Sequence, residues 1–256
     1  MNGEVSLLRP ATSNPATRPE LSDTLRASVT AKRAQVIGLL KKAVSEFGNE
    51  ISFANSMGAE DMVLTDIILR EQLPIEIFSL DTGRLPVETY ELMAEVEKTY
   101  NTRLKIFFPR SETVESYVQT NGINAFYESV DLRKACCHMR KVEPLSRALK
   151  GKKAWVTGMR EQQSSTRVGL PLREFDESHG LEKFNPLSDW TEQETWAYIR
   201  TNEVSYNKLH DQFYPSIGCA PCTRAVATGE DVRAGRWWWE DPASKECGLH
   251  VKKAPI

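Results

Sequence analysis

Features that would place this chain in a membrane, a secretory pathway or a nucleic-acid complex are missing from its sequence. No apolar run approaches the roughly 18 residues that a membrane-spanning helix needs, and the first twenty residues lack the apolar core of a signal peptide. Lysine and arginine total 33 against 35 aspartate and glutamate, so the formal net charge is −2. This balance gives no electrostatic reason to expect nucleic acid or an anionic membrane as a partner. We therefore expect a cytoplasmic protein that binds neither.

Two motifs of nucleotide-cleaving loops are absent as well. The sequence contains no G-K-S or G-K-T, which excludes a Walker A site, and no S-G-G-x-D-S loop of the pyrophosphatases that cleave ATP. Cysteine is scarce, with five residues in 256. Five cysteines without an export signal indicate a reducing compartment and argue against a disulfide framework.

The cysteines that are present form two close pairs and one single residue. Cys136 and Cys137 are adjacent, Cys219 and Cys222 form a C-x-x-C motif, and Cys247 stands alone. Such pairs occur in structural zinc sites, thioredoxin-like redox loops and iron–sulfur sites. Adjacent side chains diverge, so a cubane that offers each thiolate its own iron fits the vicinal pair better than one zinc ion does. Four buried, unliganded thiols are a further alternative.

Strands and helices alternate along the chain from residue 51 onward. Expected helices cover residues 20–47 (as one helix or two), 60–70, 86–100, 111–120 and 190–200, and expected strands cover 51–54, 75–80, 104–108, 154–157 and 181–184. This order predicts an α/β fold with a mainly parallel sheet and helices on both faces. Ligands of such sheets bind beyond the carboxyl ends of the strands.

Three loops at expected strand ends have the composition of anion-binding sites. Residues 56–61 form a small turn that opens a helix, residues 80–85 contain a D-T-G turn, and residues 158–167 carry two arginines among hydroxyl and amide side chains. Each loop read alone could be an ordinary turn. The candidate substrate-binding residues are Ser56, Met57, Gly58, Ala59, Glu60, Asp61, Leu80, Asp81, Thr82, Gly83, Gly158, Arg160 and Arg167.

Together with the cysteines, these loops resemble those of the assimilatory adenylylsulfate reductases in the phosphoadenylylsulfate reductase superfamily. The resemblance spans residues 50 to 250. Besides the three loops, the matching segments are C-C-H-M-R-K at 136–141, N-P-L-S-D-W at 185–190, Y-P-S-I-G-C-A-P-C at 214–222, R-A-G-R-W-W-W at 233–239 and E-C-G-L-H at 246–250.

The resemblance implies a fold like that of the adenine-nucleotide α-hydrolases, with a mobile C-terminal tail. It also implies one 4Fe-4S cluster per chain, held by Cys136, Cys137, Cys219 and Cys222, and Cys247 as the nucleophile. We accordingly expect a disordered tail at 1–19, a nucleotide-binding domain with the cluster at 20–230, and a C-terminal segment with the catalytic cysteine at 231–256. A homo-oligomer stays open.

The implied reaction is the thioredoxin-dependent reduction of adenylylsulfate to sulfite and AMP through a cysteine S-sulfo intermediate, for cysteine biosynthesis. A thiolate must approach a sulfonate in this reaction, so cationic groups are needed around the reacting atoms. With Cys247, the expected catalytic residues are therefore His250, Lys141, Arg233 and Arg236. Lys141 follows Cys137 by four residues and would project toward substrate from the next helical turn. We interpret Trp237–Trp239 as an anchor of the tail, and His138, His179 and His210 as ordinary histidines.

Three other functions remain as alternatives. A phosphoadenylylsulfate reductase or a dual-specificity enzyme would share the loops and the nucleophile. A tRNA sulfur-inserting enzyme of the same nucleotide fold would need the S-G-G-x-D-S loop and a basic surface, which the sequence lacks. A zinc-stabilised binding module would use the four paired cysteines without any chemistry.

Overall fold

A computed structural model describes residues 21–163, 167 and 169–241 of the chain. The disorder expected for residues 1–19 and the mobility expected for the C-terminal tail concern residues outside this range, as do the predicted roles of Cys247 and His250. None of the described helices combines the length and apolar character needed to cross a bilayer.

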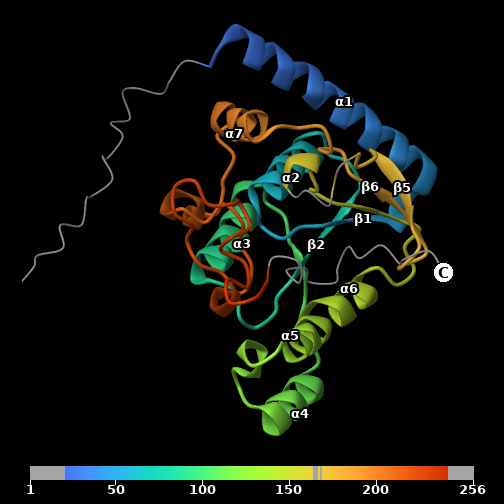
Figure 1. Cartoon of the computed structure of the whole chain (residues 1–256). Coiled ribbons are helices and arrows are strands. Elements are labelled where there is room, and N and C mark those ends of the chain that lie inside the picture. Colours follow the sequence, from blue (N-terminus) through green and yellow to red (C-terminus); the bar gives the residue numbers. More distant parts are fainter. Residues whose placement is uncertain (1–20, 164–166, 168, 242–256) are drawn as a thin grey trace, which may run out of the picture.

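The described chain forms one sheet with helices around it (Figure 1). The strands are β1 Ile51–Ala54, β2 Glu76–Leu80, β3 Lys105–Phe107, β4 Ala154–Val156, β5 Arg173–Asp176 and β6 Leu181–Phe184. The α-helices are α1 Asp23–Phe47, α2 Ala59–Arg70, α3 Val87–Thr99, α4 Ser111–Asn121, α5 Val130–Cys137, α6 Glu143–Ala148 and α7 Glu192–Thr201. Shorter turns are the π-helix His138–Val142 (η3) and the 3-10 helices Gly48–Glu50, Ala125–Tyr127, Glu161–Gln163, Lys208–Gln212 and Ala220–Cys222.

The strand order is β3-β2-β1-β4-β6-β5, and every neighbouring pair is parallel except β5 with β6. The predicted α/β fold with a mainly parallel sheet is confirmed. The chain runs from β1 outward to β3 and then returns to the other side of β1 as β4. This reversal is a topological switch point, where the crevice between strand ends favours ligand binding.

Both faces of the sheet are buried, as a parallel sheet requires. On one face Phe53 and Val156 belong to the core that α1, α2 and α7 cover. On the other face Phe78 and Trp155 pack against Leu145 of α6. Side chains alternate along each short strand and thus supply two hydrophobic layers, one on each face of the sheet.

Three differences from the expected elements have physical causes. The helix expected over 20–47 is the single helix α1, which begins at Asp23 because Ser22 Oγ accepts a hydrogen bond of 3.2 Å from Leu25 N. Helix α7 begins at Glu192 and not at Trp190, because Thr191 and Glu194 form a capping box. Strand β5 is an addition; its alternating, partly exposed residues 173–176 pair only with β6 at the sheet edge.

Candidate active site

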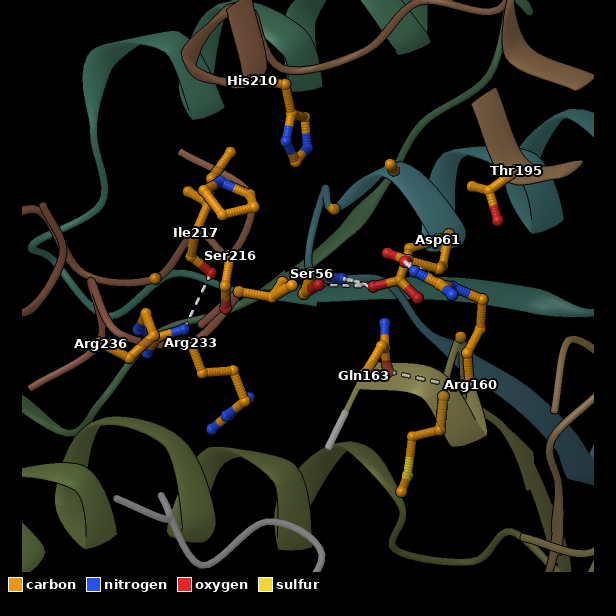
Figure 2. A pocket seen from close by; sticks show the side chains of 18 of the residues that line it. Ser56, Asp61, Arg160, Gln163, Thr195, His210, Ser216, Ile217, Arg233 and Arg236 are labelled. Atoms are coloured by element: carbon orange, nitrogen blue, oxygen red, sulfur yellow. Dashed lines mark hydrogen bonds and ion pairs between the residues drawn. The ribbon is translucent and has the colours of Figure 1, made fainter. Parts of the chain in front are cut away.

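A cleft of about 730 Å³ opens at the carboxyl ends of the central strands (Figure 2). All three loops that the sequence singled out contribute to it. The predicted residues that line it are Ser56, Gly58, Ala59, Glu60, Asp61, Leu80, Thr82, Lys141, Gly158, Arg160, Arg167, Arg233 and Arg236. The structure therefore brings together segments that are more than a hundred residues apart in the sequence.

Three predicted substrate-binding residues do not line the cleft and instead shape its loops. Met57 is buried at a φ of 62° and donates its backbone N–H to Asn55 Oδ1 at 2.7 Å. Asp81 accepts hydrogen bonds from Gly83 N at 2.7 Å and from the Tyr90 hydroxyl at 2.8 Å. Gly83 has a φ of 68°, which a residue without a side chain adopts at little cost.

Asp61 connects the loop after β1 to the loop after β4. Its Oδ2 accepts hydrogen bonds of 2.6 Å from both Ser56 N and Ser56 Oγ, and its carboxylate also accepts one from the Gly158 backbone. Burial raises the pKa of Asp61 to about 6, although the bonds from Ser56 oppose this shift. A carboxylate used in this way sets the shape of the anion loop and is not itself a ligand for an anion.

The Gly158→Ala substitution should therefore destabilise the cleft. A Cβ at Gly158 would lie 2.0 Å from Asp61 Oδ1, so the carboxylate or a loop must shift. We expect the free energy of unfolding, measured in urea, to fall by about 1–3 kcal/mol. Gly38→Ala is the control, because its Cβ meets nothing within 4 Å inside α1, and alanine is the better helix former. Equal midpoints for Gly158→Ala and the unsubstituted chain would contradict the expectation.

The cationic side chains occupy two sides of the cleft. On one side Arg160 Nη2 forms a 2.7 Å ion pair with Glu60, and Arg167 donates to Gln163. On the other side Arg233 and Arg236 lie together in Figure 2, and Arg236 Nη1 donates to Ile217 O at 3.2 Å. Glu60 therefore offsets the charge of Arg160, and Arg233 and Arg236 add cationic groups on the opposite side of the cleft.

The four paired cysteines meet in one buried pocket beside the cleft. Cys136, Cys137, Cys219 and Cys222 are each 8% exposed and line a single small cavity. The Cys219 thiol donates a hydrogen bond of 3.2 Å to Oγ1 of Thr82, which itself lines the cleft. This side-chain contact links the cysteine pocket to the cleft.

The surroundings of the cysteines favour an anionic group. The pocket is also lined by the cations Arg84, Arg133, Arg140 and Lys141. Burial, with smaller contributions from Cys219 and Cys137, raises the pKa of Cys222 to about 12. The Cys222 thiol is therefore neutral unless a metal replaces its proton.

Two buried donors beside the cysteines lack hydrogen-bond partners among the described residues. They are Arg140 Nε and Trp237 Nε1. Across residues 21–163, 167 and 169–241, no three His, Cys, Asp or Glu side chains are arranged as ligands of one metal ion.

Lys141 lines both the cleft and the cysteine pocket. The helix after Cys137 is π-helical over His138–Val142, so the expected α-helical spacing of four residues does not describe this turn. Lys141 lies within the π turn, and it still lines the same pocket as Cys136 and Cys137.

The tryptophans at 237–239 attach the end of the described chain to the body, as the sequence suggested. Trp237 is 1% exposed in the hydrophobic cluster that contains the four paired cysteines, and Trp239 packs edge-on against Tyr127 at 4.5 Å between ring centres. Trp238 is 40% exposed.

Sequence reasoning missed the wall of the cleft that α7 and the following loop supply. Thr195, Trp196 and His210 line it, and Figure 2 shows the His210 ring directed toward the cleft. Burial lowers the pKa of His210, whose ring meets Trp196 edge-on at 5.2 Å. The sequence alone predicts an ordinary histidine at 210; the available signal for its place in the cleft is its position four residues before the loop at 214–222.

Comparisons with known proteins agree with this arrangement. Residues 50–225 match the family model described as the phosphoadenosine phosphosulfate reductase domain. The chain is 58% identical to the adenosine 5'-phosphosulfate reductase of Allochromatium vinosum over 237 residues, which cover 92% of this chain and 91% of the relative. It is 52% identical to the corresponding Burkholderia cepacia reductase, over 86% of this chain and 88% of the relative.

Solved structures show the same fold. The phosphate complex of phosphoadenylyl-sulfate reductase from Candida auris superimposes with a TM-score of 0.64 at 30% identity, over 80% of this chain and 98% of that one. Yeast FAD synthetase reaches a TM-score of 0.56 at 14% identity, over 81% and 70% of the two chains, and shares the fold alone.

Proposed function

The chain belongs to the phosphoadenosine phosphosulfate reductase family, and from this premise we propose that it reduces adenylylsulfate to sulfite and AMP with a thioredoxin-type dithiol. The observation that carries the proposal is that the cleft and the cysteine pocket adjoin. Lys141 lines both of them, and the Cys219 thiol of the pocket donates a hydrogen bond to Thr82 of the cleft. The curated relatives named above support adenylylsulfate as the substrate. Reduced thiols and a thiol reductant fit a cytoplasmic location.

We propose a 4Fe-4S cluster on Cys136, Cys137, Cys219 and Cys222. The pocket supports it in three ways: four buried thiols face one cavity, cations surround them, and Arg140 Nε and the Trp237 indole are donors without partners there. Thiolate-held clusters are anionic and accept hydrogen bonds at sulfur. When bound, the cluster would supply a fixed negative charge that orients neighbouring cations, while the electrons for reduction come from thiols.

In the proposed reaction the Cys247 thiolate attacks the sulfur of adenylylsulfate. A bond forms between Cys247 Sγ and the sulfonate sulfur, the sulfur–oxygen bond of the anhydride breaks, and its electron pair leaves with the phosphate of AMP. A thiolate of the dithiol then attacks Cys247 Sγ, and sulfite departs with the electron pair of the sulfur–sulfur bond. The second thiol resolves the mixed disulfide, so Cys247 returns as a thiol and the reductant as a disulfide.

The residues of the cleft have distinct tasks in this scheme. The turn at 56–61 and the amino end of α2 would hold the phosphosulfate through backbone N–H groups. Arg233, Arg236 and Lys141 would reduce the repulsion between thiolate and sulfonate. Asp61 keeps the loop in shape and Glu60 holds Arg160 in place.

Lys141→Met should lower kcat/KM for adenylylsulfate by roughly 10²-fold, because a cation would be lost at the point where two anions meet. Initial rates of sulfite release measure this loss, and iron content shows whether the cysteine pocket is intact. Lys134→Met is the matched control, since Lys134 is an exposed lysine of the same helical stretch. A Lys141 variant with an unchanged rate would disprove the electrostatic role.

The substrate assignment is tested by comparing sulfite release from adenylylsulfate and from its 3′-phosphorylated form with thioredoxin as reductant. We expect adenylylsulfate to be used with the higher kcat/KM. Preference for the 3′-phosphorylated nucleotide would instead make the chain a phosphoadenylylsulfate reductase. The cluster is tested separately. Iron–sulfur clusters held by thiolates absorb at about 400 nm, so a purified protein that contains zinc and lacks this absorbance would exclude the cluster.

A further inference from the structure

The guanidinium of Arg236 lies directly against the backbone of Gly218. A Cβ placed on Gly218 would be 2.3 Å from Nη2, 2.5 Å from Cζ and 2.9 Å from Nη1 of Arg236, which is closer than non-bonded atoms approach. Arg236 Nη1 also donates to Ile217 O at 3.2 Å (Figure 2). The guanidinium therefore occupies space that the side chain of any residue other than glycine would fill.

The backbone at position 218 does not itself call for glycine. Several glycines of the described chain have a positive φ, such as Gly83 at 68°, but Gly218 is not one of them. The left-handed conformation that favours glycine is therefore not the reason for a glycine at this position. The feature that Gly218 supplies is room for the side chain of Arg236.

The backbone of Arg236 is attached to the same loop. Arg236 forms an antiparallel bridge with Thr223. Thr223 Oγ1 accepts a hydrogen bond of 3.2 Å from Gly218 N and donates one of 2.9 Å to Cys219 O. The loop at 217–223, which carries the second cysteine pair, thus holds Arg236 both by its backbone and by its guanidinium.

This arrangement fixes a cation at the wall of the cleft. Arg236 and Gly218 both line the cleft, and Arg236 is 7% exposed. A guanidinium held in one orientation can direct its N–H groups at an anion. The atoms that a methyl group at 218 would strike are the end of a flexible side chain beside open space. The methyl group would therefore displace the cation and leave the chain in place.

We propose, on the basis of the proposed function, that Gly218 is a positioning residue for Arg236. The missing side chain lets the guanidinium lie on the loop of the second cysteine pair, and this contact fixes the cation where the phosphosulfate of adenylylsulfate binds. Gly218 acts through Arg236 and not through a contact of its own with substrate. The loop that carries Cys219 and Cys222 therefore also sets the position of a cation of the cleft.

Gly218→Ala is the test, in the enzyme as purified with its iron. Sulfite release gives kcat/KM for adenylylsulfate, and affinity is measured in a Cys247→Ser background, where no reaction follows. Iron content and the urea midpoint report the cysteine pocket and the fold. Arg236→Ala and the double variant Gly218→Ala/Arg236→Ala complete a double-mutant cycle. A crystal structure of Gly218→Ala locates the guanidinium independently of activity.

We expect kcat/KM and affinity to fall by about tenfold in Gly218→Ala, because a displaced guanidinium loses a charge-assisted hydrogen bond to the anion. Iron content and the urea midpoint should match those of the unsubstituted protein, since only the end of a side chain has to move. Once residue 236 is alanine, adding Gly218→Ala should change kcat/KM no further. The crystal structure should show the guanidinium away from Ile217 O.

Two other glycines provide matched controls. Gly38→Ala meets nothing within 4 Å inside α1 and should change neither kcat/KM nor affinity. Gly235 directly precedes Arg236, but its Cβ would lie 2.2 Å from the backbone atom Arg224 O, so Gly235→Ala should lower the urea midpoint. The comparison separates a glycine that makes room for a side chain from one that makes room for the backbone.

An unchanged kcat/KM in Gly218→Ala, or a guanidinium still at Ile217 O, would overturn the proposal. So would loss of iron or a lower urea midpoint, since either result would make Gly218 a support of the pocket or of the fold. A further decrease on adding Gly218→Ala to Arg236→Ala would show that the glycine acts on another group. If the unsubstituted enzyme released no sulfite from adenylylsulfate, the proposed function itself would fail. The crystal structure would then still decide whether Gly218 positions Arg236.

Discussion

Cys247→Ser should abolish sulfite release, with kcat lower by roughly 10³-fold or more. A serine hydroxyl is not ionised near neutral pH and is a far weaker nucleophile than a thiolate. An oxygen sulfonate at this position could not be released by thiol attack either, because no sulfur–sulfur bond would exist. Sulfite assays and mass spectrometry of the C-terminal peptide after mixing with adenylylsulfate measure both consequences.

The substitution should leave the rest of the site intact. Iron content, visible absorbance and adenylylsulfate affinity are expected to match those of the unsubstituted protein, because the four cysteines of the pocket lie on other segments. A Cys247→Ser enzyme that kept even a tenth of the rate would refute the nucleophile assignment. A sulfonated peptide from the pocket would move the assignment to another thiol.

Cys222→Ser should produce the opposite result: a protein that keeps Cys247 but loses its iron. Cys222 is buried beside Cys137 and Cys219, and a hydroxyl in its place is a poor ligand for iron. We expect iron to fall from about four per chain to below about one, the absorbance near 400 nm to disappear, and turnover to fall by roughly 10²-fold or more. Iron analysis, spectroscopy and sulfite assays check these outcomes.

Cys222→Ser should also destabilise the fold, because of the charged residues around the pocket. Without a bound anionic group, Arg140 would lose the anion that its buried charge faces in the pocket, whereas Glu240 would still neutralise Arg133. The free energy of unfolding should therefore fall as well. Cys247→Ser and Cys222→Ser control each other, because one should lose only the nucleophile and the other only the iron. Full activity of an iron-free, colourless protein would contradict the cluster.

The fold was largely predictable because its determinants are local. The strand at 51–54, the small turn at 56–61 and the amphipathic chain after it specify a strand–turn–helix unit that periodicity and turn chemistry reveal. The rule for parallel sheets then places the loops at a common edge. Strand β5 was not predicted because three of its four residues, Arg173, Glu174 and Asp176, are charged and the strand lies at an exposed edge, where the Arg173 guanidinium packs on the rings of Phe47 and Phe184.

The candidate site was less predictable because its details depend on distant partners. Arg160 has the residue type of an anion ligand, yet Glu60, 100 residues earlier, holds it in an ion pair. Asp61 belongs to an anion loop but is directed at Ser56 and Gly158. The pairing of Arg133 with Glu240, 107 residues apart, has no signal in a single sequence.

The order in which a ribosome makes this chain leaves the cysteine pocket incomplete until synthesis is almost finished. Cys137 emerges 85 residues before Cys222, which at about 5–20 residues per second is a delay of roughly 4–17 s. The carboxylate that closes over Arg133 follows later still. Insertion of the proposed cluster must therefore come late in synthesis or after it, and nascent chains that stall before Cys219 would expose a vicinal thiol pair without the second cysteine pair.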